Sequence, residues 1–377
     1  MDFTFSEEQQ AAAEAARGIF AGVAPDTVPS PSLTAGAVAE DFDRALWGRL
    51  SDADLLSLLA APEHGGAGLD AIALCLVLRE AAKVLARVPL LEHSAAVAAV
   101  QHHGGPELRS ALLPAAVRGE LVLTVAANGR TGHDPAELAV TARQEEGGWI
   151  LDGVQTAVPW AYGADVVLVP ARTPADRTVL AAVPRLHEGV ALAEQISTTG
   201  ERLAELRLDS ARLTARDVVE AEGAWEWLRD LLTTGTCALA LGLGERVLRM
   251  TSEYTGKREQ FGFPVATFQA VAVQAADRFI DLRAMEATLW QAAWRIATGA
   301  PGALPASGDV AVAKIWACEG IRRVVQTAQH LHGGFGADVD YPLHRYHAWA
   351  KHLELSLGPA AAHEETLGDL LAAHPLA

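Results

Sequence analysis

Three long, apolar, alanine-rich segments near the end of the chain constrain the fold most. They cover residues 225–254, 268–299 and 309–334, and apolar side chains recur in each at helical spacing. Helices of this length bury their apolar faces by packing side by side in antiparallel bundles. The glycines of the first segment leave room for neighbouring helices to approach closely; they are Gly235, Gly242 and Gly244. We therefore predict a C-terminal helical bundle.

The middle of the chain has a residue pattern typical of β-strands. Residues 118–213 contain short β-rich runs separated by glycine, proline and aspartate, with Gly147-Gly148 between two of them as a hairpin signal. Residues 1–117 again have helical patterns, with segments 42–60 and 71–86 the clearest. We predict a mainly α protein with a central β domain, divided into an N-terminal helical domain (1–117), a middle β domain (118–213) and a C-terminal bundle (214–377).

Two polar residues mark expected helix starts in the N-terminal part. Ser6 precedes an acidic and polar first turn, and Asp70 precedes the apolar run that begins at Ala71. Serine and aspartate are favoured at the N-cap because their side-chain oxygens accept hydrogen bonds from the first free backbone N–H groups.

Composition excludes some partners. The chain has 30 basic and 47 acidic residues, a formal net charge of −17, which disfavours nucleic acid as a partner. Its three cysteines, Cys75, Cys237 and Cys318, lie far apart in apolar helical contexts and are expected to be reduced core residues. The polar N-terminus resembles no signal peptide, and no apolar run matches a membrane span. We expect a cytoplasmic protein without a membrane partner.

Two segments of the C-terminal part carry groups suited to a phosphate-containing ligand. Residues 258–271 are REQFGFPVATFQAV, and residues 329–346 are QHLHGGFGADVDYPLHRY. Arg258 is a permanent cation with five N–H donors, which suits a pyrophosphate. Glycines let backbone N–H groups approach a ligand closely, and glutamine amides add donors and acceptors. These residues are Gln260, Gln269, Gly333, Gly334 and Gly336.

The order of these motifs resembles the acyl-CoA dehydrogenase family. The pattern is Arg-x-Gln-Phe-Gly-x-Pro-(x)3-Phe-Gln, followed by His-Gly-Gly-x-Gly and Pro-Leu-x-Arg; residues 1–10 and the turn 62–69 look like the family's N-terminal region too. The resemblance implies an N-terminal helical domain, a β-barrel-like middle domain, a C-terminal four-helix bundle, and a tetramer with FAD at a subunit interface. The positions that it assigns to FAD binding are Arg258, Gln260, Phe261, Gln269, His330, Gly333 and Gly334. His330 stands where the family often has glutamine.

The same resemblance locates a missing group. The family removes an α-proton with a glutamate, and in many members this residue precedes a glycine after the Pro-Leu-x-Arg helix. The matching residue here is Leu357, before Gly358. Other members place the glutamate early in the first C-terminal helix, where this chain has Leu232. An aliphatic side chain cannot accept a proton, so no catalytic base is assigned.

Several nearby carboxylates are weak substitutes for the base. Asp230 is the best candidate and Glu226 the next, since both lie close to Leu232 in sequence. Three other carboxylates lie close to Leu357 in sequence: Glu354, Glu364 and Glu365. For all five residues an exposed charge on a helix is the simpler explanation.

The flavin-ring segments also depart from the family pattern. The family's Thr-Glu-Pro-x-x-Gly-Ser-Asp loop matches residues 125–137, where only Gly132 and Asp134 agree and His133 replaces the serine. The family's Lys-x-Trp-Ile-Thr/Ser-Asn segment matches residues 155–160, which end in Pro159 and Trp160. Groups that would reach a neighbour's FAD are therefore retained, whereas those for the chain's own flavin ring are eroded.

This division suggests one subunit of a mixed tetramer. The segment 338–358 also looks like the smaller, base-lacking subunits of actinobacterial heteromeric acyl-CoA dehydrogenases that act on steroid side-chain CoA thioesters. The implied partners are a homologous subunit in an α2β2 tetramer, an acyl-CoA with a bulky acyl group, and electron-transfer flavoprotein as electron acceptor. Two alternatives are a homotetrameric flavoenzyme that uses Asp230 or Glu226 as base, and a flavin-free structural or regulatory subunit.

The remaining motifs have simpler interpretations. His102-His103 precede two glycines and suggest a helix end, and His344 and His347 lack a third ligand, so no metal site is predicted. Six tryptophans are expected in the core or at subunit interfaces, with one or two lining a broad substrate cleft. They are Trp225, Trp227, Trp290, Trp294, Trp316 and Trp349.

Overall fold

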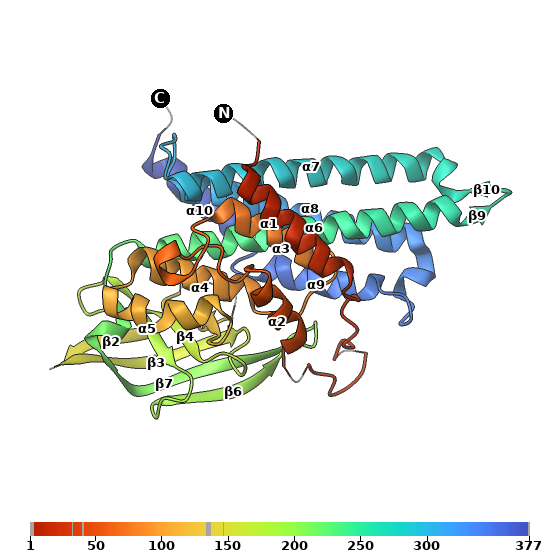
Figure 1. Ribbon diagram of the computed structural model, residues 1–377. Helices are drawn as coiled ribbons and strands as arrows, with labels where there is room; N and C mark the ends of the chain where they lie inside the picture. The colour runs from red at the N-terminus through yellow and green to blue at the C-terminus, as the bar shows by residue number, and fades with distance from the viewer. Residues whose placement is uncertain (1–3, 32, 40, 133–136, 146, 376–377) are drawn as a thin grey trace.

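The computed structural model describes residues 4–31, 33–39, 41–132, 137–145 and 147–375. Helices, a mixed sheet and a second set of helices follow one another along the chain (Figure 1). The predicted fold class, mainly α with a central β domain, is confirmed. The predicted domain boundaries remain a proposal, and the last strand paired into the sheet, β8 (Val218–Val219), lies beyond the expected boundary at 213.

The N-terminal helices begin at the residues that their caps predict. Ser6 accepts a hydrogen bond from Gln9 N, and the Gln9 side chain reciprocates at the Ser6 backbone. Asp70 accepts from the N–H groups of Ile72 and Ala73. The elements are α1 (Glu7–Ala21), α2 (Arg44–Asp52), η1 (Pro62–His64), α3 (Ala71–Ala82), α4 (Leu90–His103) and α5 (Pro106–Val117).

Two of these helices are shorter than the apolar pattern suggests. The segment 42–60 is helical only to Asp52, because Asp54 adopts a left-handed conformation with φ 58°. The segment 71–86 leaves the helix after Ala82, and Leu85 has φ 51°. Leu55, Leu56 and Leu85, which follow the ends of these helices, are still buried in the helical core, so the apolar pattern extends beyond the helices themselves.

The middle of the chain forms one mixed sheet in the order β6-β7-β3-β2-β4-β5-β8, with β1 parallel to β4. The predicted hairpin pairs β2 with β3 and places Glu145 opposite Gly148. The strands are β1 (Leu123–Val125), β2 (Val140–Glu145), β3 (Gly148–Val158), β4 (Val166–Arg172), β5 (Thr178–Pro184), β6 (Val190–Ile196), β7 (Arg202–Thr214) and β8.

Strand β4 connects two apolar cores. Val166 and Leu168 lie in the core shared with the helices, whereas Val167 and Val169 lie in the core of the β domain. Alternate side chains of a strand point to opposite faces, so a strand covered on both faces has an almost continuous apolar sequence. Helix α4 contacts both β1 and α6 and thereby joins the sheet to the bundle.

The C-terminal helices pack around α6 (Ala224–Lys257), which contacts α3, α7, α8 and α9. A Cβ at Gly242 would overlap the Arg79 carbonyl of α3, and one at Gly235 would overlap Leu91, so the prediction of close approach is confirmed. The other elements are β9 (Glu259–Gln260), β10 (Phe263–Pro264), η3 (Val265–Thr267), α7 (Gln269–Thr298), α8 (Ala306–His332), η4 (Gly333–Ala337), α9 (Leu343–Leu355) and α10 (Ala360–Ala373).

Helix α6 is also, among the described residues, the one helix long and apolar enough to cross a membrane. Its most apolar stretch is 78% buried against the rest of the protein, as in the core helix of a bundle. The three cysteines are free and buried, in agreement with their predicted core positions.

A buried charge cluster ties the N-terminal loop to the rest of the chain. Asp26 accepts hydrogen bonds from Arg87 of the α3–α4 connection, from Arg345 and from the Trp349 indole of α9. Both arginines also donate to the Thr199 carbonyl, next to β7. Four parts of the chain that are far apart in sequence are thus fixed to one another.

Candidate FAD half-site and ligand cavity

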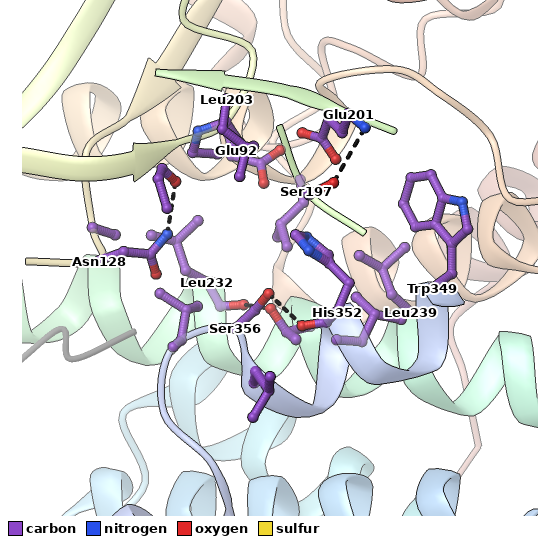
Figure 2. Close-up of a pocket in the computed structure, with 18 of the residues that line it drawn as sticks. Glu92, Asn128, Ser197, Glu201, Leu203, Leu232, Leu239, Trp349, His352 and Ser356 are labelled. Atoms are coloured by element: carbon purple, nitrogen blue, oxygen red, sulfur yellow. Dashed lines mark hydrogen bonds between the residues drawn. The ribbon is translucent and has the colours of Figure 1, made fainter. Parts of the chain in front are cut away.

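A cavity of about 550 Å³ lies between the sheet, α4, α6 and α9. Figure 2 shows Leu232 and Leu239 on α6 along one wall, and His352 and Ser356 at the end of α9 along another. Most of the lining is aliphatic, and the volume is in the range of small-molecule sites.

Both positions that the family resemblance assigns to a catalytic base line this one cavity. Leu232 lies on α6 and Leu357 in the loop after α9, and the side chain of each is almost fully buried. Leu357 has φ 58°, and its carbonyl accepts a hydrogen bond from the His363 ring. The cavity wall therefore has an aliphatic side chain at both positions, and neither can take a proton.

The substitute carboxylates lie elsewhere. Asp230 and Glu226 are not among the residues that line the cavity, and Glu226 is exposed. Burial raises the pKa of Asp230 to about 6, against the opposing effect of Arg229 beside it. Three others are also outside the lining: Glu354, which pairs with Lys351, and the exposed Glu364 and Glu365.

Two carboxyl groups that sequence reasoning missed do line the cavity, Glu92 of α4 and Glu201 before β7 (Figure 2). Burial raises the pKa of Glu92 to about 7, although its carboxylate accepts a hydrogen bond from the Trp160 indole at 3.0 Å. Burial, reinforced by Glu92, raises the pKa of Glu201 to about 8. A charged residue inside the apolar run of α4 was the available signal for Glu92.

The segment expected near a flavin ring has an altered surface. Ala157 and Trp160 have φ of 52° and 57°, and Pro159 between them has no N–H to donate. The Trp160 ring lines the cavity and contacts Phe42 edge-on, so a large aromatic side chain forms this part of the cavity wall. His133 and Asp134 lie outside the described residues.

The other predicted residues gather at the far end of the bundle, around the β9–β10 hairpin (Figure 1). Arg258 is exposed, and within the described part of the chain its side chain has no ion-pair or hydrogen-bond partner. Gln260 and Gln269 are exposed beside it, and Phe261 is 90% exposed. An unpaired guanidinium, two amides and an uncovered aromatic ring form a surface suited to a ligand or subunit outside this chain.

The glycine segment lies at the same end. Tyr254 of α6 stacks on His332 at 4.4 Å and on Phe335 at 5.4 Å, which holds η4 against the end of α6. Gly333 and Gly334 are exposed with no neighbouring atom in the way of a Cβ, so a ligand can reach their backbone. His330 is exposed on the last turn of α8.

Other predictions for polar and aromatic residues have mixed outcomes. Trp349 lines the cavity and Trp225 is in the core, whereas Trp316 is 38% exposed. His102 and His103 end α4, as expected, and stack edge-on against Trp227. Within the part of the chain that the structure describes, no group of three or more histidine, cysteine or acidic residues is arranged to hold a metal ion.

Comparison with known proteins identifies the family of the chain. Residues 6–120 match the model of the acyl-CoA dehydrogenase N-terminal domain, and residues 233–371 match that of the C-terminal domain. The chain is 37% identical to acyl-CoA dehydrogenase FadE27 of Mycobacterium tuberculosis over the full length of both. It is 33% identical to FadE28 of the same organism over 58% of this chain and 61% of the relative.

Solved structures show the same relationship. A chain of the ChsE4-ChsE5 complex from Mycobacterium tuberculosis is 37% identical and superposes with a TM-score of 0.90 over the whole of both chains. A variant of the Tcur3481-Tcur3483 steroid ACAD is 37% identical with a TM-score of 0.88, over 97% of this chain and 98% of the other. The chain therefore belongs to the acyl-CoA dehydrogenase family, whose members are oxidoreductases with FAD as cofactor.

Proposed function

We propose that this chain is one subunit of a mixed α2β2 acyl-CoA dehydrogenase. It contributes Arg258, Gln260 and the other residues of the hairpin end to the pyrophosphate and adenosine part of an FAD held mainly by its partner. The partner, a homologous subunit, supplies the glutamate that removes the α-proton. The reaction is α,β-desaturation of an acyl-CoA, with the flavin taking up the hydride.

One observation carries this proposal. The two positions where the family places its base, Leu232 and Leu357, line the same cavity and are both aliphatic. At the opposite end of the bundle, Arg258 is exposed without a partner among the described residues. A subunit that completes a neighbour's site and not its own needs this combination: no reaction centre in its own cavity, and an exposed cation elsewhere on its surface.

The hairpin end and the cavity differ in how well they suit FAD. The hairpin end offers a guanidinium and accessible glycine backbone, which match the charge and oxygen acceptors of a diphosphate. The cavity fits a flavin ring poorly: the matching segment has Pro159 without an N–H, and Trp160 fills space within it. We therefore derive no step of the reaction in this chain's own cavity.

The substrate class follows from the relatives. The similar ChsE4-ChsE5 complex has two different chains, and the Tcur3481-Tcur3483 protein is a steroid ACAD. We extend both features to this chain: a heteromeric partner, and a bulky acyl group such as a steroid side chain. Electron-transfer flavoprotein is the proposed acceptor, and the complex is proposed to work in the cytoplasm.

Co-expression with a homologous acyl-CoA dehydrogenase subunit encoded nearby tests the proposal. We expect a yellow mixed tetramer with about one FAD per two chains, and a colourless or insoluble chain when it is expressed alone. Replacing Arg258→Ala should weaken FAD binding to the mixed tetramer roughly 10- to 100-fold, because a charge-assisted hydrogen bond to phosphate contributes about 1.5–3 kcal/mol.

The matched control is Arg49→Ala on α2, which removes another exposed cation, far from the hairpin along the chain. FAD affinity should be unchanged in this variant. A yellow homotetramer with one FAD per chain would refute the proposal and favour the self-sufficient enzyme with an unusual base, to be sought by replacing Asp230 and Glu226. A mixed tetramer that never binds flavin would favour the structural subunit.

A further inference from the structure

The cavity contains a buried polar group without a partner. Glu201 is 3% exposed, yet its Oε1 atom has no hydrogen-bond partner among the described residues. Among the described residues, the hydrogen bonds of Glu201 are made by its backbone: its N–H donates to Ser197 Oγ, and its carbonyl accepts from Ser197 N–H. Leaving a buried oxygen without a hydrogen bond destabilises the folded protein, so such groups usually have a functional explanation.

The space in front of this carboxyl group is apolar. Leu91, Leu203, Leu232 and Leu239 line the cavity of about 550 Å³, and Figure 2 places Glu92 and Glu201 together on the side facing α6. Polar groups also line other walls of the cavity, among them Asn128, His352 and Lys351. A mainly apolar volume with a few polar groups is the usual form of a small-molecule site. The apolar walls favour a ligand that is mainly apolar, and the carboxyl group of Glu201 determines which polar group the ligand can have.

The charges around Glu201 restrict the polar part of the ligand. Two carboxyl groups disfavour an anion. A cation is disfavoured as well, because Arg87, which lines the adjoining small cavity with Glu201, acts on the same carboxyl group, and Arg345 lies beside Arg87 on Asp26. A neutral oxygen remains: burial raises the pKa of Glu201 to about 8, and the protonated carboxyl group can donate its O–H to a carbonyl or hydroxyl oxygen.

We propose that this chain's own cavity is a second, non-catalytic binding site for a neutral, bulky apolar molecule with a carbonyl or hydroxyl oxygen, which Glu201 recognises. The site is separate from the partner's active site. The inference does not depend on the FAD half-site, because it rests on the cavity and on the unpartnered oxygen alone.

Two matched probes test the proposal: 5α-androstan-3-one and 5α-androstane, which differ by one oxygen. Each is delivered from the same cyclodextrin to the purified complex, and binding is followed by calorimetry and by tryptophan fluorescence, since Trp160 and Trp349 line the cavity. We expect the ketone to bind about tenfold or more tightly than the hydrocarbon. The variant Glu201→Leu should lose this preference and one class of binding sites.

The control is Glu205→Leu, on strand β7, which begins directly after Glu201; Glu205 pairs with Arg207 and lies outside the cavity lining, so this variant should bind both probes as the wild type does. Equal affinity of the wild type for the two probes overturns the inference, as does absence of binding or an unchanged preference in Glu201→Leu. Loss of FAD binding in Arg258→Ala leaves this result unaffected, so the two proposals fail separately.

Discussion

Removing the charge of Asp26 should destabilise the protein strongly. The side chains of Asp26, Arg87 and Arg345 are only 2%, 9% and 3% exposed, so water cannot replace the lost carboxylate. In Asp26→Asn both guanidinium groups keep their charge. In either orientation the amide NH2 replaces an oxygen that accepts a hydrogen bond from Arg87, Arg345 or Trp349. Breaking a buried ion pair costs about 3–5 kcal/mol, and we expect a loss in this range.

The pH dependence gives a second signature. Burial alone would raise the pKa of Asp26, but the hydrogen bonds and charge of Arg87, with Arg345 and Trp349, hold it below its ordinary value. A depressed folded-state pKa means that the stabilisation is complete above the unfolded pKa of about 3.9 and is lost as the pH falls through the folded value. The difference between wild type and Asp26→Asn should therefore shrink as the pH falls below about 4.

Urea unfolding of both proteins, at one protein concentration and at several pH values, measures these effects. The control Glu194→Gln removes a partly exposed partner of Arg202 and should change the free energy of unfolding by about 0–1 kcal/mol. A loss in Asp26→Asn no larger than this control, or a difference that stays constant into acid, would refute the reasoning.

Two further predictions concern α6 and the cavity. Gly242→Ala should destabilise by about 1–3 kcal/mol or more, because its Cβ meets the Arg79 carbonyl, whereas Gly256→Ala on the same helix faces open space and should gain up to about 1 kcal/mol; thermal unfolding of both variants compares them. The raised pKa of Glu92 means that wild-type stability falls as the pH rises from about 4.3, the unfolded value, to about 7. Glu92→Gln can still accept the Trp160 bond, so relative to wild type it should gain at most roughly 3 kcal/mol between pH 5 and 8, and a pH-independent difference would contradict this.

Local patterns predicted the elements well where local interactions control them. The caps at Ser6 and Asp70 start their helices because side chain and backbone lie within a few residues of each other. The ends of the helices at Asp52 and Ala82 were harder to predict. There Asp54 and Leu85 adopt left-handed backbone conformations that redirect the chain, while their neighbours remain apolar. The apolar periodicity alone therefore does not predict where the helix ends.

The sequence by itself determined the order of helices and strands and the chemistry that is absent, since a leucine cannot act as a base in any fold. Through a family motif, it also predicted which residues of the hairpin end would bind FAD. Only the tertiary structure decided that Leu232 and Leu357 face one cavity, that Glu92 and Glu201 lie inside it, and that Asp26 is buried between two arginines. Burial and proximity arise from segments that meet across the fold, and no local pattern of residues encodes such a meeting.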